Sequence, residues 1–443
     1  MRSVAAASPS RRWLPLGAVA AAISLTALVL VIYADRGNLW QMIDLRVYLW
    51  AGQAARTSPD VYRLRYDGLL SFTYTPFALT ICRAASFLSI AAARWVLTIA
   101  TVAAMGLSAW LALGIAGQRR TTGRLGLALL LGAIVLWLEP VQQTLAFGQV
   151  NAVLMVVVLA DLALPERCWL KGIGVGLAAG FKLTPAIFIG YLVLTRQWRA
   201  AVVAAATFAA TVGYGFLAMP AAAHQYWLGG LFADTSRLGN VSYLANQSLY
   251  GALSRVLRLS GPGLWRVWLP VGLTVAVAGL TLATWAHRRQ LRLLAVAATA
   301  VTGLLVSPVS WSHHWVWIAV VVVALADLAL RYRSWLTFGL AVAVDALFFS
   351  YPLRPPGNPW VPMGIIWTAP YAPQDAWRTW HGLQWVTGDL YVLAGLVLLA
   401  ALAGYLAVPD RAARPAVPRA VARQPQASPE PLPEGATGGR AHQ

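Results

Sequence analysis

Long runs of apolar residues are the feature that most limits what this chain can fold into. Their length suits membrane-spanning helices, which need about 20 residues each, and they lack the short alternating pattern of an outer-membrane β-barrel. Only 11% of the 443 residues are charged, whereas a soluble domain carries about a quarter. The sequence therefore predicts an all-α polytopic membrane protein.

The basic residues set the predicted topology. A net charge of +19 would suggest nucleic acid in a soluble chain. In a membrane protein, however, basic residues mark cytoplasmic loops and contacts with anionic lipids, so we predict membrane lipids as partners and no nucleic acid. Arginines cluster at both ends of the chain and in short segments between the apolar runs. Both termini are therefore predicted to be cytoplasmic.

About twelve transmembrane helices are predicted, within a range of 10–13. Residues 172–195 could form one helix, but this would place Arg196 and Arg199 outside and invert the downstream topology. A break at Thr184-Pro185 avoids this, and broken helices are tolerated where they line a cavity. The predicted ranges are 14–33, 95–116, 125–138, 150–164, 172–182, 184–195, 200–219, 265–286, 292–306, 315–330, 335–350 and 387–407.

Three predicted outer segments are too long to be turns, namely 34–94, 220–264 and 351–386. The first is expected to hold amphipathic helices on the membrane surface, and the third, rich in Pro and Trp, an interfacial cap. We divide the chain into a membrane domain, 1–407, and a Pro/Ala/Arg-rich tail, 408–443, which is predicted to be disordered and cytoplasmic.

Asp44, which follows the first apolar run, is the strongest functional candidate. An uncharged side chain would be cheaper beside a membrane helix, so a carboxylate there suggests function. A salt bridge to Arg46 or a helix N-cap role is the structural alternative. Asp35, Asp60 and Asp67 lie in the same segment and compete for the role. One carboxylate among neutral and basic polar groups at one membrane face suggests an enzyme acting on a charged, lipid-borne substrate.

Lys182 and a group of amides interrupt other apolar runs. A lysine inside an apolar stretch is costly unless it meets an anion, and phosphate suits its three donors. Snorkelling to the membrane surface is the alternative. Gln142, Gln143, Gln149 and Asn151 place four amides within ten residues. Such amides could bind sugar hydroxyls or join neighbouring helices.

The adjacent His313 and His314 invite a metal site, but neighbouring side chains diverge on a helix. No zinc-binding spacing accompanies them, so we predict no metal and no cofactor. One histidine bonding a phosphate while the other packs against Trp is more economical. The sequence also lacks a nucleotide-binding glycine loop and a nucleophilic serine elbow.

Taken in order, these motifs resemble those of the actinobacterial polyprenol-phosphate-mannose-dependent α-1,2-mannosyltransferases of glycosyltransferase family 87. The motifs are Asp44-Leu-Arg-Val-Tyr48, Tyr74-Thr-Pro-Phe77, Gly148-Gln-Val-Asn151, Phe181-Lys-Leu-Thr-Pro185, Asn246-Gln-Ser248 and Ser307-Pro with Ser310-Trp-Ser-His-His-Trp315. The resemblance implies the C-type glycosyltransferase fold with periplasmic loop helices. It also implies a periplasmic active site in the cell membrane, polyprenyl-phosphate-mannose as donor, and a mannosylated glycolipid or lipoglycan acceptor.

The resemblance also implies roles for single residues. Asp44 would be the general base, taking a proton from the acceptor 2-hydroxyl. Inversion in one displacement needs no second carboxylate. Lys182, with His314 or His313, would bind the donor phosphate, and His314 is favoured. The residues predicted to bind sugar or acceptor are Tyr48, Tyr74, Gln149, Asn151, Asn246 and Gln247.

Two other functions stay open at this point. Another polyprenyl-phosphate-sugar transferase, for example an arabinosyltransferase, would use the same layout. A polytopic lipid or sugar transporter would couple Asp44 and Lys182 to ions or substrate. Transporters place such groups near the bilayer midplane, often within inverted repeats, whereas here the polar motifs gather at one predicted face and no repeat is visible. This favours the enzyme, with acceptor choice expected in 220–264 and 351–386.

Overall fold

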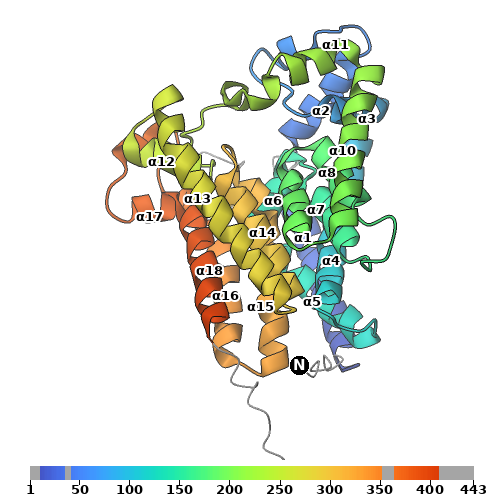
Figure 1. Cartoon of the computed structure of the whole chain (residues 1–443), viewed down its shortest axis with the longest axis vertical. Helices are drawn as coiled ribbons and strands as arrows, with labels where there is room; N and C mark the ends of the chain where they lie inside the picture. The colour runs from blue at the N-terminus through green and yellow to red at the C-terminus, as the bar shows by residue number, and fades with distance from the viewer. Residues whose placement is uncertain (1–9, 35–40, 352–363, 409–443) are drawn as a thin grey trace, which may run out of the picture. The chain divides into compact units, whose positions relative to one another are not determined.

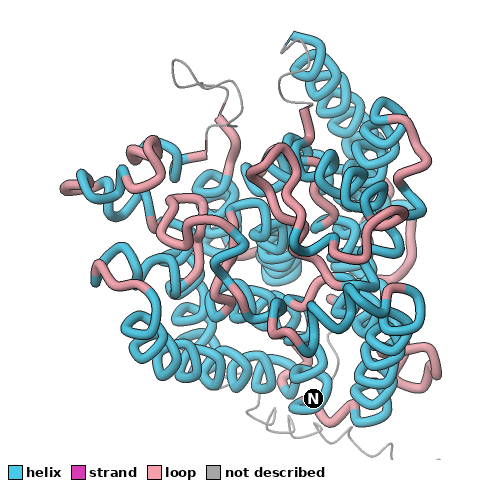
Figure 2. Tube along the Cα trace, turned by 90° about the horizontal axis from the view of Figure 1, so that it is seen from above, coloured by secondary structure: helices cyan, strands magenta, loops and turns pink. Residues whose placement is uncertain are grey.

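The computed structural model describes residues 10–34, 41–351 and 364–408. In these ranges the chain is built of helices and loops, with only isolated β-bridges (Figures 1 and 2), so the predicted all-α class is confirmed. Residues Val4–Ala407 form one compact unit, to which the following description applies. Most of the predicted tail, residues 409–443, lies outside the described residues, as do 35–40 and 352–363.

Long apolar helices make this a multi-pass membrane protein. Among the described residues, six segments are long and apolar enough to cross a membrane, or seven if one bent helix pair counts as a span. The six are α1 (Trp13–Ala34), α4 (Ile90–Ile115), α10 (Trp198–Ala218), α13 (Gly261–Arg288), Ser312–Tyr332, which contains α15 (Ile318–Tyr332), and α18 (Leu390–Ala407). The bent pair is α6 (Glu139–Phe147) with α7 (Asn151–Leu162).

Each of the twelve predicted ranges contains a helix, but several helices are short. These are α5 (Thr122–Val135), α8 (Ile173–Phe181), α9 (Ile187–Leu194), α14 (Arg292–Val306) and α16 (Trp335–Phe348). At about 1.5 Å per residue, helices of 8–15 residues do not cross a core of about 30 Å alone. The count of twelve spans therefore stays a prediction.

Two breaks in the helices carry the polar motifs. α6 and α7 meet at an angle of 118°. The turn between them begins at Gly148, whose φ of 69° lies in the left-handed region that glycine adopts without strain. The break expected at Thr184-Pro185 begins two residues earlier, because α8 ends before Lys182, whose backbone is extended. A short 3₁₀ turn, Thr184–Ala186, then leads into α9.

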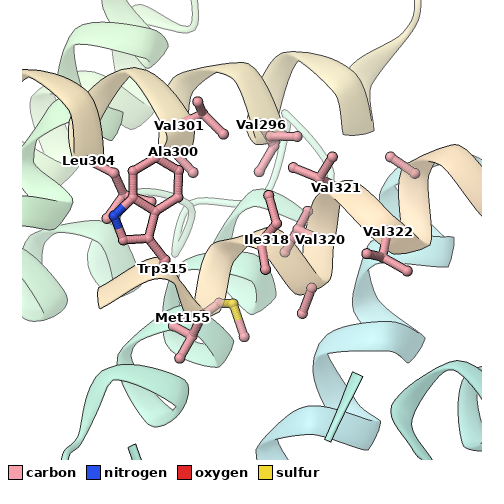
Figure 3. Close-up of a cluster of buried hydrophobic side chains, with 14 of the residues drawn as sticks. Met155, Val296, Ala300, Val301, Leu304, Trp315, Ile318, Val320, Val321 and Val322 are labelled. Carbon is pink, nitrogen blue, oxygen red and sulfur yellow. The ribbon is translucent and has the colours of Figure 1, made fainter. Parts of the chain in front are cut away.

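A large apolar core lies where α7, α14 and α15 meet (Figure 3). Met155 of α7, Leu304 of α14 and Ile318 of α15 belong to this cluster and lie around Trp315. Trp315 is fully buried there, and its indole N–H donates to the backbone carbonyl of Gln247 at 3.0 Å. Since a buried indole needs such a partner, this packing fixes the turn that carries the two histidines.

A second apolar cluster is built on α2 (Ile43–Ala54) and α3 (Pro76–Ala85), the helices expected within 34–94. α3 lies beside α10 in Figure 1, and α2 packs against α3. A Thr-Pro pair starts α3, where the Thr75 hydroxyl accepts the Ala78 N–H and Pro76 occupies the first turn. The start of α2 is joined to α6 by a hydrogen bond from the Met42 N–H to the Ala146 carbonyl.

Candidate active site

Asp44 lies in the first turn of α2 and is hydrogen-bonded to a distant amide. Its Oδ2 accepts the Nε2–H of Gln149 at 2.6 Å. Met42 is the N-cap of the helix, and Arg46 donates to the backbone carbonyl of Gln41 at 2.9 Å. In this described region, the Asp44 carboxylate is therefore neither the N-cap of α2 nor paired with Arg46. The positive end of the α2 dipole favours an anion at this position.

Two phenols hold that amide in place. Tyr48 lies one turn beyond Asp44 on the same helix face. Its hydroxyl is 2.8 Å from the Tyr74 hydroxyl and 2.9 Å from Oε1 of Gln149. Tyr74 donates to the same Oε1 at 2.8 Å. Because phenol protons are directed at the amide oxygen, the amide NH₂ is oriented toward Asp44.

The pKa of Asp44 lies between that of an ordinary aspartate and neutrality. Burial raises it from 3.8 to about 6, while the Gln149 hydrogen bond and the positive charge of Lys182 act in the opposite direction. At neutral pH the group is still ionised, and it binds a proton more tightly than an exposed carboxylate does. These are the properties of a general base.

Lys182 turns into the protein toward three polar or aromatic partners. Its Nζ donates to Oδ1 of Asn151 at 2.8 Å and lies 2.9 Å from Nε2 of His314. The same nitrogen is 5.4 Å from the ring centroid of Tyr74. An ammonium group has three N–H donors. Two of them are used here, which leaves one for an anionic ligand.

The two histidines have different partners, and the packing partner is not the tryptophan that the sequence suggested. The rings of His313 and His314 are inclined at 80°. His314 faces Lys182, whereas His313 packs edge-on against Phe147 rather than a tryptophan. The backbone carbonyl of His313 accepts the Asn151 amide N–H at 3.0 Å. In the described part of the chain, no three His, Cys, Asp or Glu side chains gather where they could hold a metal.

A pocket beside Lys182 has one polar end and a largely apolar wall. Its polar end is formed by Asn151, Lys182 and His314. The wall was not predicted, because its residues look like any others in membrane helices. Its main apolar members are Leu154, Met155, Ile187, Phe188, Leu304 and Trp317. A pocket that is polar at one end and apolar along its wall suits a phosphate that is joined to a hydrocarbon chain.

Asn246 and Gln247 lie in a different cluster, although the sequence grouped them with the sugar-binding candidates. Both are fully buried. Each amide is hydrogen-bonded to backbone groups through its oxygen and its nitrogen. The partners are Val241, Pro308 and Ser310 for Asn246, and Leu244, Gly388 and Tyr391 for Gln247. The structure therefore gives these two amides a positioning role, and their contact with sugar stays a prediction.

Two groups that matter here gave little sequence signal. The Thr75 hydroxyl donates to the Gly180 carbonyl, which ties the start of α3 to the end of α8, next to Lys182. Glu139 is fully buried and accepts hydrogen bonds from Trp367 and Tyr391, each at 2.7 Å. Both connections join residues more than 100 positions apart, so no local pattern reveals them.

Comparison with known proteins gives a consistent result. The model of glycosyltransferase family 87 matches residues 72–308, a range that includes Tyr74, Gln149 and Lys182. A polyprenol-phosphate-mannose-dependent alpha-(1-2)-phosphatidylinositol mannoside mannosyltransferase of Mycobacterium tuberculosis is 34% identical over 75% of this chain and 78% of its own length. A phosphatidylinositol pentamannoside mannosyltransferase of Mycolicibacterium smegmatis with the same donor dependence is 32% identical over 81% and 84%. No solved structure matches.

Proposed function

Since the chain belongs to glycosyltransferase family 87, we propose that it transfers mannose from polyprenyl-phosphate-mannose to a mannosylated phosphatidylinositol lipid, forming an α-1,2 linkage. The relatives' names support the donor and the acceptor class. The observation that carries the proposal is the placement of Asp44 near Lys182, so that one base and one cation act on the same site.

In the proposed reaction Asp44 is the general base. The acceptor 2-hydroxyl oxygen attacks the anomeric carbon of the donor mannose, and its proton passes to Asp44. The bond between that carbon and the phosphate oxygen breaks, and its electron pair leaves with the polyprenyl phosphate. Gln149 holds the carboxylate in position, with Tyr48 and Tyr74 fixing the amide and bordering the sugar. A phosphate is a good leaving group, so a second carboxylate is not required.

Lys182 and His314 are proposed to bind the donor phosphate. Nε2 of His314 and Oδ1 of Asn151 already hold the Lys182 ammonium, so its remaining N–H needs little reorganisation when negative charge develops on the leaving group. The polyprenyl chain would follow the apolar wall of the adjacent pocket. His313 is assigned to positioning, because its carbonyl holds the Asn151 amide that accepts from Lys182.

We also propose the finer architecture, namely the C-type fold with twelve spans, both termini in the cytoplasm and the active site on the periplasmic face. The distribution of arginines supports this orientation. A reporter that works only outside the cytoplasm should then be active when it is fused after residue 94, 264 or 386. A reporter that works only in the cytoplasm should be active when it is fused after residue 119, 196 or 290. The opposite result at any point would change the span count there.

The function is tested with purified protein in nanodiscs. Labelled mannose transfer from synthetic polyprenyl-phosphate-mannose is measured for the wild type and Asp44→Asn across a panel of mannosylated lipids. We expect transfer by the wild type and none by the variant, with donor binding unchanged. Equal transfer by both proteins would remove Asp44 from the mechanism.

The same preparation separates the alternatives. Transfer from polyprenyl-phosphate-arabinose, but not from the mannose donor, would indicate an arabinosyltransferase. Movement of lipid or sugar across proteoliposomes without any transfer would indicate a transporter.

A further inference from the structure

A second cavity, of about 300 Å³, lies beyond the end of α2 that is far from Asp44. Its walls come from the segment after α2, from α3, and from the junction of α10 with α11 (Pro220–Ala223), elements that lie together in Figure 1. Two arginines line it, Arg56 and Arg83. The remaining wall is mostly apolar and includes Val61, Leu79 and Met219. No sequence motif marked this site.

The two arginines carry charge that the described protein does not neutralise. Neither is in an ion pair among the described residues. Arg56 lies 3.7 Å from the ring centroid of Phe87 and donates to the Ser86 hydroxyl at 2.8 Å. Ser86 in turn donates to the backbone carbonyl of Arg83 at 2.8 Å. The Arg56 guanidinium is thus held in place with further donors unused, an arrangement suited to phosphate oxygens.

The surface around the cavity indicates that a phosphate group bound there would belong to a lipid. α10 is one of the helices able to cross a membrane, and it ends at Ala218, in the wall of the cavity. Phe87 is 78% exposed and Leu217 is 85% exposed. Large apolar side chains beside paired cations at the end of a spanning helix match the boundary between acyl chains and head groups. A free phosphate ion would make no use of them.

We propose that the Arg56/Arg83 pocket binds the phosphodiester of the acceptor's phosphatidylinositol head group. The inference rests on the proposed function. Ala54, the last residue of α2, is 10 residues from Asp44, which at the helical rise corresponds to about 15 Å, and Arg56 follows two residues later. Several hexose rings bridge such a distance. Phosphate held at one end of α2 would therefore present the far end of the glycan to the base at the other end.

The kinetic test compares two acceptors. With a phosphatidylinositol mannoside, Arg83→Gln should raise the acceptor KM about tenfold, the usual effect of losing a charge-assisted hydrogen bond. Its donor KM and kcat should stay unchanged, and Arg83→Lys should give an intermediate value. With an alkyl mannoside that lacks phosphate, wild type and variant should have the same KM. Arg65→Gln, an exposed arginine of the same outer segment, is the matched control.

An equal rise in KM for both acceptors, or no rise for either, would overturn the proposal. A direct binding measurement keeps the pocket testable without activity. Thermal unfolding is followed in phosphatidylcholine nanodiscs with added phosphatidylinositol, phosphatidylglycerol or inorganic phosphate. Phosphatidylinositol should raise the midpoint for wild type but not for the variant Arg56→Gln/Arg83→Gln.

The outcomes distinguish the two proposals. Arginine-dependent stabilisation by phosphatidylinositol, in a wild type that transfers no mannose, would support the pocket and reject the function. Equal stabilisation by phosphatidylglycerol would make this a general anionic-lipid site and overturn the acceptor assignment. Stabilisation by inorganic phosphate alone would overturn the lipid assignment as well.

Discussion

At the scale of single residues, Asp44 depends on one amide, and that amide depends on two phenols. Gln149 gives its N–H to the carboxylate and receives the hydroxyl protons of the tyrosines at its oxygen. In the proposed mechanism, Gln149 therefore affects the basicity of Asp44 without contacting the acceptor hydroxyl. Burial and this hydrogen bond have opposite effects on the pKa of Asp44, and both effects can be measured.

The transfer rate should follow the ionisation of Asp44. Because burial raises the pKa of Asp44 to about 6, the acid limb of kcat/KM should be centred near pH 6. Below about pH 6 kcat/KM should fall tenfold for each pH unit, since a protonated carboxyl cannot accept the hydroxyl proton. A pH–rate profile from about pH 5 to 8 checks this. An acid limb centred near pH 4 would mean that Asp44 is not desolvated.

The same shift predicts a stability effect of Asp44→Asn. A raised pKa means that the folded protein binds this proton more tightly than the unfolded chain, so ionisation destabilises the fold as pH rises from about 4 to 6. Asn removes that charge. The variant should therefore unfold at the same temperature as wild type or a higher one at pH 7, while being inactive. A clearly lower midpoint would favour a structural role for Asp44.

Replacing Gln149 should move the acid limb. Gln149→Leu removes the hydrogen bond that stabilises the carboxylate, so the pKa of Asp44 should rise. A charge-assisted hydrogen bond contributes about 1.5–3 kcal/mol, which corresponds to about one to two pH units. The pH–rate profile should shift upward by that amount, with most of the rate recovered at high pH. A uniform loss at every pH would point to misfolding instead.

How far a single residue can be interpreted from sequence depends on how many uses its side chain has in a membrane protein. A carboxylate or a lysine among apolar residues has few inexpensive uses, so Asp44 and Lys182 could be selected from the sequence. An amide has many uses, and Asn246 and Gln247 bond backbone groups instead of joining the Asp44 cluster. The arginine cavity could not be predicted either, because arginines are common in the outer segments and only the fold pairs Arg56 with Arg83.

At the scale of helices and their connections, the turn between α6 and α7 brings Gln149 to α2. Gly148 has positive φ, and a Cβ at that position would lie 2.8 Å from the Cβ atoms of Met42 and Leu45. Those two residues flank Asp44. The left-handed turn therefore sets how closely the helix that carries Asp44 approaches the turn that carries Gln149.

Gly148→Ala should separate that pair. Alanine pays about 1–2 kcal/mol in the left-handed region, and its methyl group would push α2 away. We expect kcat to fall at least tenfold and the unfolding midpoint to drop. Gly190→Ala in α9 is the matched control, because nothing lies within 4 Å of the added Cβ. The control should keep full activity, and equal losses in both variants would remove the special role of Gly148.

The helices could largely be predicted from the sequence, whereas their lengths and bends could not. Long apolar runs located a helix in each predicted range because burial in lipid or in protein requires the same residues. For that reason it did not separate spanning helices from buried short ones such as α14, which has 15 residues. The 118° bend was missed as well, since Gly148 is the only local signal and glycine is common throughout this chain.

At the scale of the whole molecule, one buried ion pair joins distant parts of the chain. Arg255 of α12 (Leu249–Leu257) is fully buried and pairs with Asp389, which directly precedes α18. The same guanidinium donates to the backbone carbonyls of Ser242, Tyr243 and Asn246. It thus fixes the 240–248 loop, and through it the Trp315 turn that carries the histidines.

Removing this arginine should unfold more than one element. Arg255→Leu leaves Asp389 buried without its partner, which typically costs about 3–5 kcal/mol. We expect a much lower unfolding midpoint in detergent and loss of donor binding. Arg378→Leu is the control, because its pair with Asp375 is long, at 3.6 Å, and both side chains are more than half exposed. The control should change stability by less than about 1 kcal/mol.

The two partners of Glu139 lie 228 and 252 positions further along the chain. At about 5–20 residues per second, synthesis delivers them tens of seconds after Glu139 has left the ribosome. Until then a carboxylate in the first turn of α6 has neither indole nor phenol to satisfy it, and apolar surroundings are unfavourable for it. During biogenesis, insertion of α6 into the lipid is therefore unfavourable until the last helices have been made. Assembly of the turn that carries Gln149 then becomes one of the final events in making the protein.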